Sequence, residues 1–275
     1  MKQRELDILV LSDLHLGTNQ CRAGRLLKYL KSVKPEMLIL NGDIIDIWLL
    51  DLKKWPKKHT KVMSYFFQLM IDGTPIYYLP GNHDDYLKQF TGFKFHNFFI
   101  ENELVLEIDG KKNWFMHGDK YDKTISGRSR NLAIRAGKAY DAVVGFNRLI
   151  NQWENFLGKK NTLNFTKVLK DKTKSRIKKS NDFEQVYIEE AAENEIDNLL
   201  CGHVHRPGIT TLCSIKNERE VNYLNSGDWT ENCTSLEYYN KSWHLYRYDF
   251  NYNHYESTLK NMNFNDEDIN PFLFK

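Results

Sequence analysis

The chain has 275 residues, of which 41% are hydrophobic and 27% are charged, as in a folded globular protein with a sizeable core. Its apolar runs are too short to span a bilayer, and the first residues lack the cleavage region of a signal peptide. The four cysteines are scattered and form no Cys-x-x-Cys pair, which favours free thiols in a reducing compartment over disulfides or a zinc knuckle. These features argue against a membrane-spanning or disulfide-rich secreted protein and predict a cytoplasmic one.

The net charge of +3 is unevenly distributed along the chain. Between Arg128 and Lys179 there are 14 lysines and arginines but three acidic residues, whereas the rest of the chain has 25 basic and 33 acidic residues. One block is therefore basic and the remainder is acidic. Such asymmetry indicates a surface that meets an anionic partner, such as phosphate, nucleic acid or a lipid headgroup layer.

The first hundred residues alternate strand-like and helix-like patterns. Short apolar runs at 7–13, 36–43 and 74–85 are separated by segments with helical spacing at 22–33 and 57–71. Apolar strands between amphipathic helices predict a βαβ series whose sheet is buried on both faces. Each apolar run ends in a polar cluster, and ligands of open α/β sheets bind at the carboxyl ends of the strands.

The second part of the chain returns to strands after a helical block. Residues 103–116 predict two strands joined by a turn at Asp109-Gly110. Apolar spacing then predicts an amphipathic helix over 132–157 and a broken, lysine-rich helical stretch over 163–192. Five strand patterns follow between residues 197 and 250. We therefore expect one domain over 1–275, interrupted by a helical cap insertion over about 122–192.

Five polar clusters stand at the ends of predicted strands. Each cluster alone is typical of a surface turn, since Gly, Asp and Asn are ordinary turn residues and His-x-His is a short pattern. Five such clusters in one chain, each following a strand, instead favour a shared metal site. Their members are Asp13, His15, Asp43, Asn82, His83, Asp84, His117, Asp119, His203 and His205.

The spacing of these residues suits a dinuclear metal centre. Residues two apart on an extended chain point to the same side, so Asp13 with His15, and His203 with His205, can each aim two ligands into one crevice. A carboxylate can bridge two ions about 4 Å apart, and Asp43 is the expected bridge. Imidazoles, carboxylates and one amide, without thiolates, suit Mn²⁺, Fe or Zn better than Mg²⁺ or Ca²⁺. We expect two divalent ions, with Mn²⁺ first.

The same cluster offers a catalytic acid. Two adjacent metals can activate a bridging water as hydroxide and neutralise phosphate oxygens. One further group must protonate the leaving oxygen or stabilise charge, and we expect His83 in this role, with Asp84 orienting its imidazole and keeping it protonated. The alternative is that His83 only braces the turn. Gly202, just before the late histidines, is expected to permit a close approach of the backbone.

The ordered motifs Asp-x-His, Gly-Asp, Gly-Asn-His-Asp, His-Gly-Asp and Gly-His-x-His resemble the motif set of the calcineurin-like metallophosphoesterases. The resemblance covers residues 8–120 and 198–230. It implies an α/β fold, a four-layer αββα sandwich of two mixed β-sheets, with a dinuclear centre. It also implies one metal bound by Asp13, His15, Asp43 and His205 and a second bound by Asp43, Asn82, His117 and His203.

A narrower resemblance bears on the substrate. The stretches NGDIIDIW, HGDKYD and GHVHRP…NSGDW, with a helical insertion, resemble the UDP-2,3-diacylglucosamine diphosphatases of lipid A biosynthesis. Those enzymes act at the cytoplasmic membrane face. The resemblance implies that this chain cleaves the lipid-linked sugar nucleotide to a lipid monophosphate and UMP. The third motif departs from theirs, because it reads Asn-His-Asp where that group has Asn-Arg-Asp. The stretch NSGDWTENCTSLEY resembles bacterial phosphoesterases whose substrates are not settled.

The basic block has three interpretations. It could be a solvated charged face, or a nucleic-acid surface, although it lacks the strand-borne aromatics of single-strand binders. It could also cap the metal crevice, with Arg128 and Arg130 holding substrate phosphates and apolar residues meeting an acyl chain or an anionic membrane. We favour lipid or membrane contact and a peripheral protein. The alternatives for the whole chain are a nucleotide or nucleic-acid phosphodiesterase and a non-catalytic scaffold, against which the intact ligand positions argue.

Overall fold

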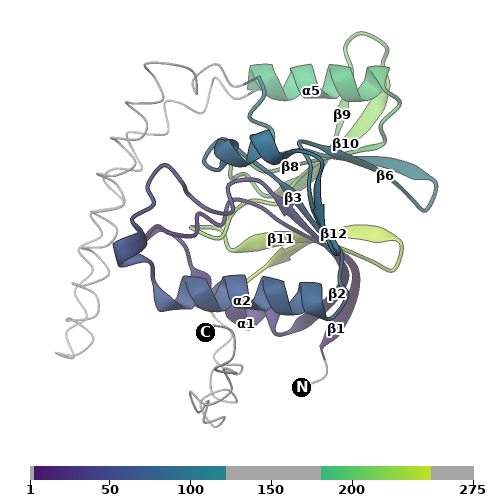
Figure 1. Ribbon diagram of the computed structural model, residues 1–275. Helices are drawn as coiled ribbons and strands as arrows, with labels where there is room; N and C mark the ends of the chain where they lie inside the picture. The colour runs from purple at the N-terminus through teal and green to yellow at the C-terminus, as the bar shows by residue number, and fades with distance from the viewer. Residues whose placement is uncertain (1–2, 122–180, 249–275) are drawn as a thin grey trace, which may run out of the picture.

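The computed structural model describes residues 3–121 and 181–248, which form two facing β-sheets between layers of helices (Figure 1). The elements in chain order are β1 Arg4–Leu11, α1 Ala23–Leu30, β2 Val33–Asn41, the 3-10 helix η1 Leu52–Lys54, α2 Lys57–Ile71, β3 Ile76–Leu79, the 3-10 helix η2 Asp85–Phe90, β4 Phe93–Phe95, β5 Phe98–Ile100, β6 Leu104–Ile108, β7 Lys111–Phe115, α5 Asn181–Glu193, β8 Asn198–Cys201, β9 Gly208–Cys213, β10 Glu220–Asn225, β11 Thr234–Tyr239 and β12 Ser242–Arg247.

Both sheets are mixed. The larger sheet has seven strands in the order β12-β11-β1-β2-β3-β5-β4, and the smaller has five in the order β6-β7-β8-β10-β9. In the larger sheet β1, β2, β3 and β5 run parallel, and the remaining strands are antiparallel to their neighbours. In the smaller sheet β7, β8 and β10 run parallel, and β6 and β9 are antiparallel edge strands.

Strand β1 illustrates how sequence alternation builds the layers. Leu9 and Leu11 pack in the core under α1 and α2, while Ile8 and Val10 pack between the two sheets, because successive side chains point to opposite faces. On the outer side of the smaller sheet, α5 packs Ile188 into a third core. The layers are thus helices, the larger sheet, the smaller sheet and a helix, which confirms the predicted αββα sandwich (Figure 1).

Most predicted elements correspond to observed ones. The segments 22–33 and 57–71 contain α1 and α2, and the turn between β6 and β7 places Asp109 and Gly110 at φ of 48° and 75°, as a tight two-residue hairpin requires. Residues 86–102 show no pattern that predicts an element, but they include most of η2 and the strands β4 and β5.

The predicted insertion over 122–192 is described only in its last residues. Residues 181–192 belong to α5, which packs on the smaller sheet. Residues 122–180, including Arg128 and Arg130, lie outside the described residues. Within 3–121 and 181–248, no helix is long and apolar enough to cross a bilayer.

The parallel strands bring their carboxyl ends to one edge of the sandwich. Asn41, at the end of β2, donates its side-chain N–H to the carbonyl of Leu200 in β8 at 3.3 Å. This hydrogen bond joins the two sheets at the edge where the polar clusters follow the strands. The fold therefore assembles at one place the residues that the sequence analysis singled out.

Candidate metal centre

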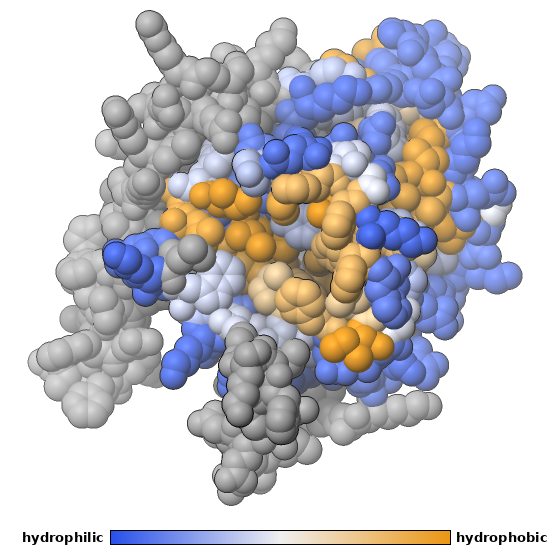
Figure 2. All heavy atoms as spheres, viewed as in Figure 1, coloured by the Kyte–Doolittle hydropathy of each residue, from blue (hydrophilic) through white to orange (hydrophobic). Residues whose placement is uncertain are grey.

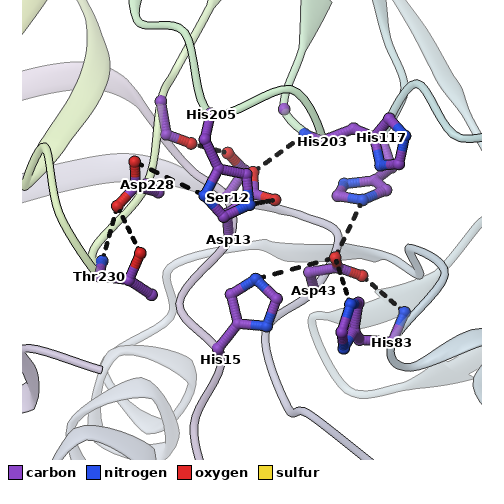
Figure 3. A network of polar contacts seen from close by, with 12 residues as sticks. Ser12, Asp13, His15, Asp43, His83, His117, His203, His205, Asp228 and Thr230 are labelled. Atoms are coloured by element: carbon purple, nitrogen blue, oxygen red, sulfur yellow. Dashed lines mark hydrogen bonds and ion pairs between the residues drawn. The ribbon is translucent and has the colours of Figure 1, made fainter. Parts of the chain in front are cut away.

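Side chains from five strand ends meet at this edge. The imidazoles and carboxylates labelled in Figure 3 point toward one another from loops of both sheets. The contributing residues are Asp13 and His15 after β1, Asp43 after β2, Asn82 and His83 after β3, His117 after β7, and His203 and His205 after β8.

The backbone of these loops is strained where the ligand candidates stand. Asp13, His15, Asp43, His203 and His205 all have positive φ, between 49° and 63°. Non-glycine residues adopt this left-handed conformation infrequently, at a cost of about 1–3 kcal/mol each where it is strained, and such residues cluster at functional sites. Backbone hydrogen bonds from the N–H of Asp13 to the carbonyl of residue 42 at 3.0 Å, and from His15 to the carbonyl of Asp43 at 2.9 Å, hold two of the loops together.

Glycines allow the loops to approach one another. A Cβ atom at Gly202 would lie 2.5 Å from Oδ2 of Asp13, and one at Gly42, where φ is +84°, would overlap the imidazole of His117. The close approach expected at Gly202 is confirmed. It lets the backbone N–H of His203 donate to Oδ2 of Asp13 at 3.1 Å.

Asp43 lies among three imidazoles. Its Oδ2 is 3.4 Å from Nε2 of His117, 3.9 Å from Nε2 of His15 and 4.0 Å from Nε2 of His83. Burial would raise the pKa of Asp43, but the imidazoles outweigh burial and hold that pKa well below its usual range. Asp43 is therefore ionised, and its place between the histidines suits the bridging role expected of it.

Asp13 forms the other side of the centre with His205. Nε2 of His205 lies 3.0 Å from Oδ1 of Asp13. Burial would lower the pKa of His205, but the carboxylate of Asp13 raises it to about 9. Asp228, which the sequence analysis missed, places Oδ2 3.7 Å from Nδ1 of His205, and Asn232 donates to the carbonyl of His205 at 3.0 Å. Both residues belong to the NSGDWTEN stretch.

Five buried polar atoms of the centre make no hydrogen bond within the part of the chain that the structure describes. Two of them, Oδ1 of Asp13 and Nδ1 of His83, lie 3.0 Å and 2.9 Å from their ion-pair partners His205 and Asp46. The other three are Nε2 of His15, Oδ1 of Asn82 and Nε2 of His117. His15 and His117 direct their other ring nitrogens to protein oxygens, at 3.0 Å from Oδ2 of Asp46 and 3.0 Å from the carbonyl of Asn41. Metal-binding histidines have this arrangement, because the second N–H orients the ring.

Groups of three ligand atoms also lie close enough to share an ion. Within each group the ligand atoms are no more than 4.8 Å apart. Buried polar atoms without partners are costly, and a cation would satisfy those described above. The donor set therefore fits divalent metal ions. The groups are Asp13, His15 and His205; His15, Asp43 and His83; and Asp13, Asp43 and His117.

His203 stands apart from these groups of side-chain ligands. Its ring lies edge-on to that of His117, with the ring centroids 5.3 Å apart. The role of His203, and the division of ligands between two metals, remain predictions.

Asp84 occupies a different place from the one expected. Its buried carboxylate accepts hydrogen bonds from the N–H of Gly81 at 2.6 Å, the N–H of Ile44 at 2.9 Å and the hydroxyl of Tyr78 at 2.6 Å. Asp84 thus ties the loop after β3 to the loop after β2. This differs from the expectation that Asp84 orients His83, because the carboxylate that lies 2.9 Å from Nδ1 of His83 belongs to Asp46.

Asp46 is the carboxylate beside His83. Its Oδ2 lies 2.9 Å from Nδ1 of His83, and the indole of Trp48 stacks on the imidazole with ring centroids 4.3 Å apart. Burial would raise the pKa of Asp46, but His15 and His83 lower it to about 2. Neither residue was predicted as part of the site, although both stand in the NGDIIDIW stretch, three and five positions after Asp43.

Several known proteins are similar to this chain. A family profile described as calcineurin-like phosphoesterase matches residues 6–207. The chain is 27% identical over 262 residues to the UDP-2,3-diacylglucosamine hydrolase of Aliivibrio fischeri, covering 89% of this chain and 100% of that protein. It is 26% identical over 245 residues to the protein of the same name from Marinobacter nauticus, covering 83% and 92%. A solved archaeal phosphodiesterase aligns with a TM-score of 0.42 and 13% identity, over 88% of this chain and 99% of that chain.

The family profile spans most of the chain and includes every cluster from Asp13 to His205. The resemblance inferred from the motifs is confirmed, as is the expectation of a phosphoesterase, and similar proteins carry the name of the narrower group. The chain belongs to the calcineurin-like phosphoesterase family.

Proposed function

We propose that this phosphoesterase uses two divalent metal ions to cleave a phosphodiester or pyrophosphate bond. The observation that carries the proposal is a set of buried ligand atoms without hydrogen bonds among the described residues, which includes Nε2 of His15, Oδ1 of Asn82 and Nε2 of His117. They come from three strand ends and lie beside two buried carboxylates, Asp13 and Asp43. A cation pair is the partner that satisfies such a donor set.

The ions would be held in two overlapping sets. Mn²⁺ is the ion we expect, with Fe or Zn as alternatives, because the donors are imidazole, carboxylate and amide without thiolate. When bound, the ions would lower the pKa of a shared water and neutralise charge on the phosphate oxygens. Asp13, His15, Asp43 and His205 would hold one ion, and Asp43, Asn82, His117 and His203 the other.

His83 would donate the proton to the leaving oxygen. Burial lowers the pKa of His83, but the carboxylates of Asp46 and Asp43 raise it above its usual value, which favours the imidazolium. Asp46 is then a positioning residue, since it holds Nδ1 and leaves Nε2 toward the centre. Asp84 supports the site as a brace of the two loops.

The substrate that we propose is UDP-2,3-diacylglucosamine, cleaved to a lipid monophosphate and UMP. Support comes from the relatives that align over most of the chain, which are UDP-2,3-diacylglucosamine hydrolases by name, and from the NGDIIDIW and NSGDW stretches. Arg128 and Arg130 would hold substrate phosphates, and the basic block around them would contact anionic lipid at the inner face of the cytoplasmic membrane. The protein would therefore be cytoplasmic and peripheral.

Two assays test this proposal. Protein supplied with Mn²⁺ should hydrolyse bis(p-nitrophenyl) phosphate, and Asp43→Ala should lose at least about 10³-fold in rate, whereas the control Asp7→Ala, an exposed residue on β1, should not. Equal rates for Asp43→Ala and wild type would refute the metal centre.

UDP-2,3-diacylglucosamine in detergent is then compared with single-stranded DNA and cyclic nucleotides. Release of UMP supports the lipid role. Turnover of DNA or cyclic nucleotides, without turnover of UDP-2,3-diacylglucosamine, would instead identify a nucleotide or nucleic-acid phosphodiesterase.

A further inference from the structure

The NSGDWTEN stretch, which begins at the last residue of β10, connects two loops of the metal centre. Asn225 donates its side-chain N–H to the carbonyl of Gly202 at 2.7 Å, and the backbone N–H of Trp229 donates to the carbonyl of Asp13 at 3.1 Å. The first contact reaches the loop after β8, which carries His205, and the second reaches the loop after β1. The stretch therefore contacts ligand-bearing loops of both sheets.

Asp228 is the buried charged residue of this stretch. Figure 2 shows hydrophilic residues gathered toward the margins of the molecule, where charged side chains ordinarily contact water, whereas Asp228 has no exposed surface. A buried carboxylate is costly unless hydrogen bonds and an opposite charge compensate it. The partners of Asp228 therefore indicate what it does.

The two oxygens of the Asp228 carboxylate have different partners. Oδ1 accepts hydrogen bonds from the backbone N–H groups of Thr230, Glu231 and Asn232 and from the Thr230 hydroxyl. Oδ2 accepts the side-chain N–H of Asn232 and lies 3.7 Å from Nδ1 of His205 (Figure 3). Oδ1 thus holds the turn of the stretch itself, and Oδ2 faces the metal centre.

His205 is the more exposed of three histidines that have the same arrangement. His15 and His117 each place Nδ1 3.0 Å from a protein oxygen and leave Nε2 toward the centre. Their side chains are 9% and 1% exposed, whereas that of His205 is 34% exposed. Packing therefore constrains the His205 ring less, and a partner for its Nδ1 matters more. That partner is Oδ2 of Asp228, at ion-pair distance.

The two oxygens also separate a positioning role from a brace of the turn. A brace needs only the oxygen that accepts the backbone N–H groups, and an amide oxygen would serve there equally well. The second oxygen has its partners in His205 and Asn232, and the side chain of Asn232 also donates to the carbonyl of His205 at 3.0 Å. A carboxylate beside Nδ1 orients the ring and fixes the tautomer that leaves Nε2 to bind a cation.

We propose that Asp228 is a positioning residue of the metal centre, whose carboxylate orients His205 so that Nε2 can bind a divalent ion beside Asp13. The inference deepens the proposed function and rests on its metal centre, because it names the group that supports one ligand of that centre. The NSGDWTEN stretch then supports the site from behind a ligand and contributes no ligand of its own.

Mn²⁺ titration of chelator-stripped protein, followed by the electron paramagnetic resonance signal of free Mn²⁺, tests this inference without substrate. Asp228→Asn keeps an oxygen for the turn, because the donors around Oδ1 select the amide oxygen, and it presents an amide N–H to Nδ1 of His205. We expect one of the two ions to bind about 10–100-fold more weakly than in wild type. Co²⁺ bound to this variant should also show an altered visible spectrum, since the ligand field changes when the imidazole turns.

Thr230→Val is the matched control. It removes the hydroxyl that donates to Oδ1 of Asp228 at 2.8 Å and leaves Oδ2 beside His205. Its Mn²⁺ affinity and Co²⁺ spectrum should match those of wild type. Equal losses of affinity in Thr230→Val and Asp228→Asn would show that Asp228 only braces the turn, and they would overturn the inference.

A second variant keeps the test decisive if Asp228→Asn does not fold. Asn232→Ser removes the side-chain N–H that holds both Oδ2 of Asp228 and the carbonyl of His205, and it should weaken the same ion by about fivefold. Wild-type Mn²⁺ affinity in folded Asp228→Asn, or in Asn232→Ser when Asp228→Asn is unfolded, would overturn the positioning role and leave the proposed function intact. Wild-type protein that binds no Mn²⁺ would overturn both.

Discussion

Oδ2 of Asp46 lies 2.9 Å from Nδ1 of His83 and 3.0 Å from Nδ1 of His15. A single buried carboxylate thus orients both the proposed acid and a metal-ligand candidate, and it leaves Nε2 of each ring directed toward Asp43. The loop after β2 therefore supplies a central carboxylate and, three residues later, the group that positions two histidines around it.

Replacing Asp46 should alter the pH dependence of the reaction. Asp46→Asn removes the carboxylate that raises the pKa of His83, so the imidazolium is lost at lower pH and the alkaline limb of kcat moves to lower pH. The rate at saturating Mn²⁺ should fall by about a hundredfold. The exposed Asp51→Asn serves as the control. An unchanged pH profile for Asp46→Asn would contradict the positioning role.

Replacing Asp84 should affect folding more than the pH profile. Asp84→Ala leaves the buried N–H groups of Gly81 and Ile44 and the hydroxyl of Tyr78 without their acceptor. We expect a loss of about 3–5 kcal/mol in the free energy of unfolding, measured by urea titration with chelator present. Asp7→Ala should match wild type. A fully stable Asp84→Ala protein with a shifted pH profile would instead restore Asp84 as the partner of His83.

Metal binding should compete with protons at His205. In protein stripped by a chelator, Asp13 raises the pKa of His205 from 6.5 to about 9. Mn²⁺ requires the neutral imidazole, so its affinity should increase with pH up to about 9 and then level off. Calorimetry at pH 7 in buffers of different ionisation enthalpy should detect proton release. The free energy of unfolding of the stripped protein should change with pH in the opposite direction. The stabilisation that comes from the raised pKa of His205 is complete below pH 6.5 and is lost as the pH rises through 9. Equal affinity at pH 7 and pH 9 would contradict this coupling.

The thiols should differ in reactivity. Cys213 is exposed, whereas Cys21, Cys201 and Cys233 are buried. Burial also raises the pKa of the Cys201 and Cys233 thiols, which slows their reaction further. A thiol-specific disulfide reagent should therefore modify one cysteine rapidly in native protein and all four in denaturant. Cys213→Ser should remove the fast phase. Two or more fast thiols in native protein would show that the core is open.

The strand-end clusters could be predicted because their signals are local. Asp13, Asp43 and His117 each follow a buried apolar run, and a parallel sheet brings such ends to one edge. The same reasoning named Asp84 as the partner of His83 and missed Asp46, because it relied on closeness in sequence. In the folded chain the loop after β2 crosses beside the loop after β3, so Asp46 reaches His83 from 37 positions away.

The short edge strands could not be predicted for another reason. β4 and β5 are three residues each, which is too short for a hydrophobic period to be recognised. The exposure of Phe93 and Phe95 depends on their place at the sheet edge, which follows from tertiary pairing alone.

The most direct test of the account is the metal content of purified protein. After loading with Mn²⁺ and dialysis, elemental analysis of wild type should give two ions per chain, and Asp43→Ala should bind at most one, because it lacks the shared carboxylate. The two-ion protein should hydrolyse bis(p-nitrophenyl) phosphate, and chelation should abolish that activity. Wild type that retains less than one ion, or Asp43→Ala that retains two, would contradict a centre bridged by Asp43.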